Sequence, residues 1–349
     1  MTHRYAYNAL DRTLRDIRQA PDLVFGGIPT VFGGDFAQIL PVVPGGTELD
    51  VVAANIQRSP LWGHFRRLFL RQNMRLQEGQ ANIDFSLWLK DMPYNQEPHG
   101  DLMLPPEVQR LFREDDLIEF VWPENLLQNS CARPQDLGNR AILALTNESV
   151  RRFNAKVLAR FFELTSDQCP QNFYAVDVPK SDNNMGLPIE TYNNQTPAGF
   201  PPHKLELKPG VPVMCLRNVN PAIGLVNGTR LMVTNVGQHY IRARIIGSSF
   251  DGNILFIPRI IFETDEDFFL EFQRKQFPLR VSYAITVNKS QGQSLTRVGV
   301  DLTNNAFSHG QLYVALSRVT NVAFLRVLLG EGSEGMTKNV VSRQALLLP

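Results

Sequence analysis

The feature that most constrains this chain is an apolar run that ends abruptly in a polar loop. Val281–Val287 has the β-rich, apolar character of a buried strand, and Asn-Lys-Ser-Gln-Gly follows at 288–292. Amide, hydroxyl and ammonium groups are the groups that proteins use to contact phosphates and bases. A second apolar segment at 312–316 ends on a lone arginine, Arg318. A strand that leads to a polar loop, followed by an arginine on a rigid helix or strand, suits a motor that grips a polyanion and a nucleotide.

Composition limits the class of protein. The 349 residues are 43% hydrophobic and 20% charged, which predicts a packed core and two or three domains. The net charge of +1 neither supports nor excludes nucleic-acid binding, because a nucleic-acid channel needs only a local basic lining. The three cysteines stand far apart without metal-site spacing, which favours a reducing compartment. No apolar run approaches the ~20 residues of a membrane helix, so no membrane association is expected.

Two stretches of the chain show the alternation of helix and strand that is typical of α/β proteins. The spacing of apolar residues predicts a helix over Tyr5–Arg18, followed by a strand at Ile28–Phe32. Val51–Leu70 reads as a helix interrupted at Pro60. Further along, a strand at Arg140–Leu145 leads into a helix over Glu148–Phe162. Strand, polar loop and helix in this order indicate an α/β fold.

A change of period marks an inserted β domain. Four short strands are predicted and are separated by Asn-Gly and Asp-Gly turns, at 211–216, 230–233, 240–245 and 254–257. They predict a small barrel or sandwich within the α/β fold. The acidic run that ends Ile260–Asp267 is interpreted as a solvated turn rather than a metal site.

Five separated segments carry four matches to the Pif1-like DNA helicases. They are the Thr-x-Asn-Lys-Ser-Gln-Gly loop at 286–292, Tyr-Val-Ala-Leu-Ser-Arg at 313–318, Gly-Gly-Asp-Phe-Ala-Gln-Ile-Leu-Pro at 33–41, and the segments 210–214 and 224–231, which are similar to that family's 2B domain. The order of the segments is also that of the family. The resemblance is nearest to the helicases of Helitron-type mobile elements, in which Asn replaces His before Lys-Ser-Gln-Gly.

The resemblance implies a fold of RecA-like lobes of the P-loop NTPase type, the first truncated, with an inserted SH3-like β-barrel. Residues 1–75 would be the remainder of lobe 1A, and 76–185 the first part of lobe 2A with a helical excursion. Residues 186–275 would be the 2B barrel, and 276–349 the second part of lobe 2A with the C-terminal tail.

The resemblance also assigns residues to the nucleotide. Gln38 would contact the γ-phosphate or orient the attacking water, and Arg75 and Arg318 would be arginine fingers. Asp35, Gln291 and Gly292 would face the nucleotide. The plainer alternatives are a turn-capping role for Gln38 and a surface ion pair for Arg318. Arg75 competes with the neighbouring arginines at 66, 67 and 71.

A second group of residues is assigned to DNA. Thr286, Asn288, Lys289 and Ser290 would contact phosphates, with a solvated turn as the alternative. Thr146 and Asn147 would make matching contacts, although either residue is also a good helix N-cap, and both roles can hold together.

The sequence departs from the family pattern in two ways. Ala37 stands where the family usually has Arg, which weakens the case for one phosphate or DNA contact. These residues also contain no G-x-x-x-x-G-K-[ST] phosphate loop (Walker A) and no convincing acidic pair after a strand (Walker B). The family uses ATP and Mg²⁺. Binding of either by this chain alone is therefore in doubt, and no metal ligands are assigned.

Three hypotheses follow. The first is the C-terminal portion of an ATP-dependent 5′→3′ DNA helicase in repair, recombination, telomere maintenance or Helitron transposition, unable to hydrolyse ATP alone. The second is a non-catalytic remnant that binds single-stranded DNA. The third is an unstable remnant with exposed strand edges. Single-stranded DNA or DNA junctions, and the N-terminal half of the helicase, are the expected partners. A nuclear location is expected, with mitochondria as the alternative.

Overall fold

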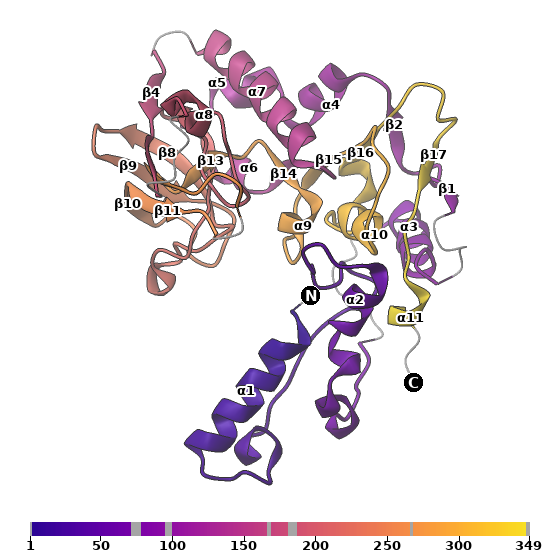
Figure 1. Cartoon of the computed structure of the whole chain (residues 1–349). Helices are drawn as coiled ribbons and strands as arrows, with labels where there is room; N and C mark the ends of the chain where they lie inside the picture. Colours follow the sequence, from indigo (N-terminus) through magenta and orange to yellow (C-terminus); the bar gives the residue numbers. More distant parts are fainter. Residues whose placement is uncertain are drawn as a thin grey trace. The chain divides into compact units, whose positions relative to one another are not determined.

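A computed structural model describes residues 2–70, 78–94, 100–165, 169–180, 187–265 and 268–346 (Figure 1). The chain forms two compact units. The first combines the two ends of the chain, Met1–Arg113 and Thr286–Pro349, and the second is the continuous segment Glu114–Ile285. Within the described residues, no helix is long and apolar enough to cross a membrane.

The first unit contains helices and several short strands. In chain order its elements are α1 (Arg4–Ile17), η1 (Val24–Gly27), α2 (Glu48–Ala53), η2 (Ile56–Arg58), η3 (Pro60–His64), α3 (Gln80–Asp91), β1 (Asp101–Met103), β2 (Gln109–Leu111), α9 (Val287–Ser290), β15 (Arg297–Leu302), α10 (Gln311–Leu316), η5 (Val322–Phe324), β16 (Leu325–Leu329), β17 (Met336–Lys338) and α11 (Arg343–Leu346). β15 and β2 lie on either side of β16, and both run parallel to it. β1 and β17 form a separate antiparallel pair.

The predicted N-terminal helix is confirmed as α1. The side chain of His3 caps it by accepting from the backbone N–H of Tyr5. The buried side chain of α1 is that of Asp11, which is polar. Asp11 accepts from the N–H of Phe25 at 2.6 Å and thereby ties α1 to η1. Two residues of the expected apolar face, Leu10 and Ile17, are 41% and 70% exposed. The predicted helical period is therefore correct, but most of the apolar face is not covered by the described residues.

The strand predicted at Ile28–Phe32 does not form. The segment is extended but belongs to no sheet of the described residues, and Val31 is 95% exposed. β-branched residues favour a strand only where a neighbouring strand accepts and donates hydrogen bonds. The helix predicted over Val51–Leu70 is broken more often than expected, into α2, η2 and η3, with Pro60 opening η3.

The second unit combines an α/β part with β-sheets. Its elements are α4 (Glu114–Val121), α5 (Glu124–Gln128), α6 (Pro134–Gly138), β3 (Arg140–Ala144), α7 (Asn147–Leu164), β4 (Gln171–Tyr174), β5 (Val176–Pro179), α8 (Ile189–Asn193), β6 (Lys204–Leu207), β7 (Pro212–Cys215), η4 (Pro221–Ile223), β8 (Arg230–Val236), β9 (Tyr240–Ile245), β10 (Ile254–Pro258), β11 (Ile260–Glu263), β12 (Phe272–Gln276) and β13 (Leu279–Val281). β14 (Ala284–Thr286) crosses the boundary between the units. The strand and helix predicted around Thr146 are confirmed as β3 and α7.

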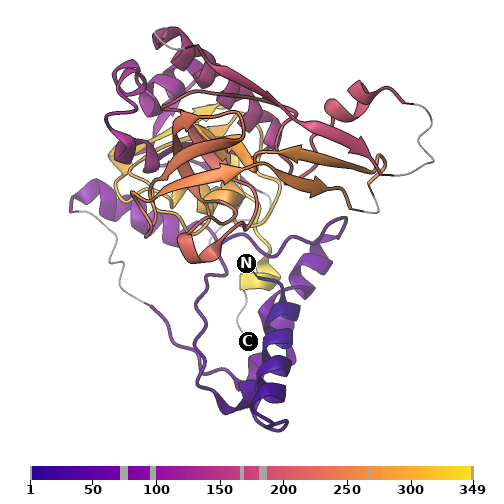
Figure 2. The same ribbon diagram turned by 90° about the vertical axis from the view of Figure 1, so that its left-hand side faces the viewer.

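The inserted β domain is also confirmed. Its main sheet has the strand order β10-β9-β8-β7-β13, with antiparallel neighbours throughout. A smaller sheet has the order β11-β12-β5. The prediction of a turn within 260–267 is wrong for the first four residues. Ile260–Glu263 pairs with β12 as strand β11. Figure 2 shows the main sheet in salmon to orange, with its broad arrows toward the viewer.

A buried arginine joins the main sheet to the α/β part of the same unit. Arg230 donates to the carbonyl oxygens of Gly138 at 2.9 Å, Arg140 at 2.8 Å and Ser282 at 3.1 Å. Burial lowers the pKa of Arg230 to about 10. Two glycines lie beside it: a Cβ on Gly138 would stand 2.8 Å from the backbone nitrogen of Gly247. Backbone therefore packs directly on backbone at this position.

A second buried arginine, Arg274, fixes the segment that precedes the main sheet. Arg274 is fully buried and forms a bidentate pair with Asp177 at 2.7 and 2.8 Å. Its remaining hydrogens reach the carbonyl oxygens of Tyr192 and Gln195. His203 contacts the same carboxylate through Nδ1 at 2.9 Å, so its role here is structural.

Candidate nucleotide and DNA site

Asp35 organises the Gly-Gly-Asp-Phe-Ala-Gln loop of the first unit. Its Oδ1 accepts from the backbone N–H of Ala37 at 3.0 Å, which closes a local turn. Its Oδ2 accepts from Nε2 of Gln38 at 3.3 Å and from the hydroxyl of Tyr313 at 3.1 Å. One carboxylate thus shapes the loop, holds the Gln38 amide and ties both to helix α10.

The Gln38 amide is oriented by this carboxylate. An ionised carboxylate can only accept hydrogen bonds, so the nitrogen of Gln38 faces Asp35 and its oxygen faces away. That oxygen accepts from Nε2 of Gln291 at 3.1 Å. Two residues that were predicted separately, 253 positions apart, are therefore in direct contact. Gln38 presents an acceptor, which suits the orientation of an attacking water better than donation to a phosphate.

The environment of Tyr313 keeps it a donor. Burial raises the pKa of its phenol, and the nearby Asp35 carboxylate raises it further. The pKa of Tyr94 is raised as well, first by burial and then by Asp35. Both hydroxyls therefore remain protonated at neutral pH, and Tyr313 continues to donate to Asp35.

His309 and Gly310, two residues without a predicted role, fasten the loop to α10. Nε2 of His309 contacts the carbonyl oxygen of Phe36 at 2.8 Å, and Nδ1 accepts from the N–H of Ser342 at 2.9 Å. This pattern fixes the neutral tautomer with its proton on Nε2. Burial lowers the pKa of His309, which favours the same neutral form. The backbone of Gly310 lies so near that a Cβ would stand 2.5 Å from the carbonyl oxygen of Ala37.

Arg318 is buried, so the alternative of a surface ion pair is wrong. It is 4% exposed, and each of its three nitrogens donates: Nε to the carbonyl of Val314 at 2.8 Å, Nη1 to the carbonyl of Gln293 at 3.0 Å, and Nη2 to the hydroxyl of Ser317 at 2.7 Å. In this arrangement Arg318 fastens the loop that carries Gln291 to the end of α10. Contact with a γ-phosphate stays a prediction and would require at least one of these bonds to exchange.

Gly292 lies beside Gln291 in a conformation that favours glycine. Its φ is +82°, and no atom lies within 4 Å of the place where a Cβ would stand. The backbone is thus open on that side. An open, left-handed glycine next to a polar amide agrees with the predicted close approach of a ligand.

The predicted DNA segment forms one helical turn, α9, rather than a loop. Asn288 is exposed, and its Oδ1 accepts from Nε2 of Gln311 at 3.4 Å. Thr286 and Lys289 are half-buried. Ser290 is fully buried, and its hydroxyl donates to the carbonyl of Val287 at 2.7 Å, so the predicted phosphate contact of this hydroxyl does not fit the structure.

Thr146 and Asn147 lie in the second unit. Oγ1 of Thr146 accepts from the N–H of Ser149 at 3.2 Å, which is the N-cap of α7 that was expected as the alternative. Asn147 is exposed on the first turn. The cap is therefore present, and a nucleic-acid contact by this pair stays a prediction.

Comparison with protein families matches two parts of the chain. Residues 1–97 match the model "PIF1-like helicase", and residues 191–236 match "DNA helicase Pif1, 2B domain". The ATP-dependent DNA helicase PIF1 of Xenopus laevis is 31% identical over 324 residues, and that of Danio rerio is 27% identical over 327 residues. The chain belongs to the PIF1-like helicase family. Both alignments cover 92% of this chain but only 44% of the relative, so the chain spans less than half of their length.

Solved helicase structures share the fold. A Pif1 structure described as a basis for DNA unwinding at forked double-stranded DNA has a TM-score of 0.65 at 21% identity and covers 99% of this chain and 70% of its own. Pif1 from Candida albicans has a TM-score of 0.59 at 23% identity and covers 99% of this chain and 73% of its own. Bacteroides Pif1 bound to single-stranded DNA has a TM-score of 0.60 at 20% identity and covers 100% of this chain and 70% of its own. The expected RecA-like fold with a 2B domain is therefore confirmed.

The side chains present fit one end of the nucleotide that the PIF1-like family uses. The amides of Gln38 and Gln291, with the open backbone at Gly292, suit a terminal phosphate and its attacking water. Among the described residues, no three His, Cys, Asp or Glu side chains gather closely enough to hold a metal ion. Arg75, the second predicted finger, lies outside the described residues.

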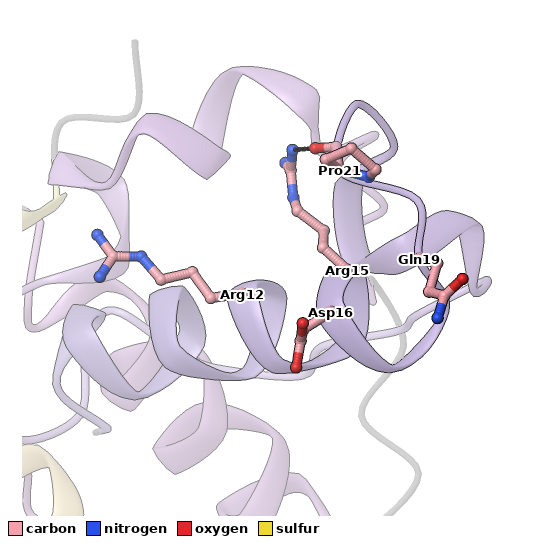
Figure 3. A pocket seen from close by; sticks show the side chains of 5 residues that line it. All are labelled: Arg12, Arg15, Asp16, Gln19 and Pro21. Carbon is pink, nitrogen blue, oxygen red and sulfur yellow. Dashed lines mark hydrogen bonds between the residues drawn. The ribbon is translucent and has the colours of Figure 1, made fainter.

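A shallow hollow elsewhere in the first unit is unrelated to this site. It lies on α1 and is lined by Arg12, Arg15, Asp16, Gln19 and Pro21 (Figure 3). The guanidinium of Arg15 turns toward the carbonyl of Pro21 and donates to it. None of the predicted site residues lines this hollow.

Proposed function

We propose that this PIF1-like chain works as the C-terminal portion of an ATP-dependent 5′→3′ DNA helicase. In this proposal, Gln38 and Gln291 face the terminal phosphate and the attacking water. The observation that carries the proposal is the hydrogen bond between them, held by Asp35 and Tyr313. A hydrogen bond that joins segments from opposite ends of the chain is best explained by a ligand that both segments contact.

We propose that the chain alone hydrolyses ATP only near background. Its sequence contains no G-x-x-x-x-G-K-[ST] segment, which in P-loop NTPases holds the β- and γ-phosphates and places Mg²⁺. The N-terminal half of a helicase would be the partner that supplies these groups. Magnesium binding would then belong to the assembled protein.

The proposed DNA partner is a single strand, contacted through Asn288 and Lys289 on α9. Bacteroides Pif1 has been solved bound to single-stranded DNA, which supports the same partner for this chain. DNA repair, recombination, telomere maintenance or Helitron transposition would be the process, and the nucleus, or else mitochondria, the place.

The test combines ATP hydrolysis with DNA binding by the purified chain. We expect background hydrolysis with or without single-stranded DNA, together with binding that weakens as salt rises. Lys289→Gln should reduce the slope of log K against log salt by about 0.7, the value for one phosphate contact on a single strand. Robust DNA-stimulated hydrolysis, or binding that does not respond to the substitution, would contradict the proposal.

A second candidate function is a binding module without a catalytic role. The observation in its favour is that the turn α9, which carries the proposed DNA contacts, is formed while the phosphate loop is lacking. A non-hydrolysable ATP analogue separates the two candidates. The analogue is added together with the N-terminal half of a PIF1-like helicase, which would supply the phosphate loop. A change in DNA affinity then supports the helicase portion, and an unchanged affinity supports the binding module.

A further inference from the structure

One face of the main sheet in the second unit carries a surface that the sequence motifs did not indicate. Along β9 and β10 buried and accessible residues alternate, so every second side chain points away from the core. The register places Arg244 opposite Ile254, Arg242 opposite Phe256, and Tyr240 opposite Pro258. The outward side chains of the two strands thus form three cross-strand pairs in a row. We call these six residues the β9–β10 face.

The aromatic members of the β9–β10 face are open to solvent. Phe256 is 63% exposed and Tyr240 is 43% exposed. Their rings meet edge to face, with centroids 5.4 Å apart. A phenylalanine this exposed contributes little to the core, because the inward residues Leu255 and Ile257 form the buried side of the same strand. Its ring is free to stack on a flat ligand.

The charges of the β9–β10 face are all positive. Arg242 is exposed and Arg244 is half-buried, and the face contains no acidic residue. Within the described residues neither guanidinium forms an ion pair. β10 is also the edge strand of its sheet. Cations that alternate with exposed rings are complementary to a chain that has both negative charge and flat, apolar faces.

We propose that the β9–β10 face binds single-stranded DNA. Bases stack on Phe256 and Tyr240, while Arg242 and Arg244 pair with the phosphates between them. Aromatic platforms combined with a basic surface are the general means of holding a single strand without reading its sequence. A duplex fits less well because its bases are already stacked. The proposal rests on the DNA partner of the proposed function, and it adds a contact surface independent of α9.

Two substitutions in the full chain separate the two kinds of contact. Phe256→Ala should weaken binding of an oligothymidine about tenfold and leave the salt slope unchanged, since only stacking is lost. Arg242→Gln should lower the salt slope by about 0.7, because one phosphate contact is lost. On an abasic oligonucleotide of the same length, Phe256→Ala should have no effect. Circular dichroism should show both variants folded, as both side chains are exposed.

Matched controls come from the same unit. Phe269→Ala removes a ring that is still more exposed, at 87%, and Lys275→Gln removes an exposed cation on β12. Neither residue belongs to the β9–β10 face, and neither substitution should change binding. Photocrosslinking of an iodouracil oligonucleotide to the unaltered chain should label the peptide that contains Tyr240 or Phe256.

The outcomes distinguish this inference from the proposed function. If Lys289→Gln weakens binding while the β9–β10 variants match their controls, the inference is wrong and the proposed function stands. If the β9–β10 variants alone weaken binding, the inference stands and the role of α9 fails. If the unaltered chain binds no single strand at low salt, both are wrong. Equal losses on abasic and normal oligonucleotides for Phe256→Ala would exclude stacking.

Discussion

At the scale of single residues, the site depends on one carboxylate. Asp35 accepts from a backbone N–H, an amide and a phenol, and through these bonds it sets the direction of the Gln38 amide. The family resemblance supplied Asp35, Gln38 and Gln291 as separate residues. It could not supply their contact, because a motif records which residues occur and not which amide atom faces which partner.

Removing the phenol should test this arrangement. Tyr313→Phe deletes the donor to Asp35 and should lower the free energy of unfolding by about 1–2 kcal/mol, as expected for a hydrogen bond to a charged acceptor that is partly exposed. Denaturant titration measures the change. Tyr5→Phe is the control, because Tyr5 is 62% exposed on α1 and should change little. Equal stability of the two variants would show that the bond to Asp35 contributes nothing.

Other residues show why sequence patterns stop short at this scale. Ser290 occupies a position where the family motif implies a phosphate contact, yet it is buried and bonded to Val287. His309 was not singled out, because a neutral histidine that bridges two backbone groups leaves no local pattern. Burial and tautomer are decided by segments far away in the sequence, here Phe36 and Ser342.

At the scale of elements, the start of α10 is shaped by the loop that packs on it. Gly310 has a φ of +73° and no room for a Cβ beside Ala37. A larger residue would have to push the Asp35–Gln38 loop away from the helix. The glycine is therefore what allows the two motifs to meet.

Gly310→Ala should destabilise the protein through both strain and overlap. The left-handed backbone alone costs a Cβ-bearing residue about 1 kcal/mol, and the overlap adds to it. Gly332→Ala is the matched control, since its φ is +77° but nothing lies within 4 Å of its Cβ position. The difference between their thermal unfolding temperatures measures the overlap. Equal shifts would mean that the loop yields without cost.

Elements with a regular helical or strand period and clear turns around them were predicted well, and the isolated apolar segment at Ile28–Phe32 was not. α1, β3, α7 and the strands β7 to β10 lie where the periodicity placed them. The single strand expected over Val281–Val287 is instead divided between the last residue of β13 and the strand β14. Ile28–Phe32 has the composition of a strand but has no partner among the described residues. A strand forms only where a neighbouring strand can hydrogen-bond to it, and a short sequence window does not show whether that neighbour is present.

At the scale of the whole molecule, the first unit is built from both ends of the chain. The contact of His309 with Phe36 joins the two ends, and the contact of His309 with Ser342 extends it within the C-terminal segment. Local sequence patterns do not predict contacts between segments that lie so far apart in the chain. The contacts of His309 also make the stability of the unit sensitive to the protonation of one imidazole.

Stability should fall as the pH decreases through the range in which His309 titrates. Burial lowers the pKa of His309 in the folded protein, and the hydrogen bond to the Phe36 carbonyl and the carboxylates of Glu48 and Asp35 offset this only in part. The unfolded chain, with a histidine pKa of ~6.5, then binds more protons than the folded one around and below that pH. The stability contribution is therefore complete above pH ~6.5 and is lost as the pH falls toward the folded pKa.

Urea midpoints at pH values of about 7.5 and about 5.5, on either side of the histidine range, check this expectation. Protonation of one group can remove at most about 1.4 kcal/mol per pH unit. His309→Gln keeps a donor and an acceptor but cannot titrate, so its midpoint should fall less with acid than that of the unaltered protein. Parallel losses in the two proteins would assign the acid sensitivity to other groups.

The facing glycines at 138 and 247 have a consequence for how related chains can diverge. A Cβ at either position would overlap the backbone of the other, and Gly247 also has a φ of +71°. A side chain at either position would require the backbone of the other to move, and no substitution at the other position would provide that movement. We therefore expect both positions to remain glycine in relatives that keep this junction between the β domain and its host.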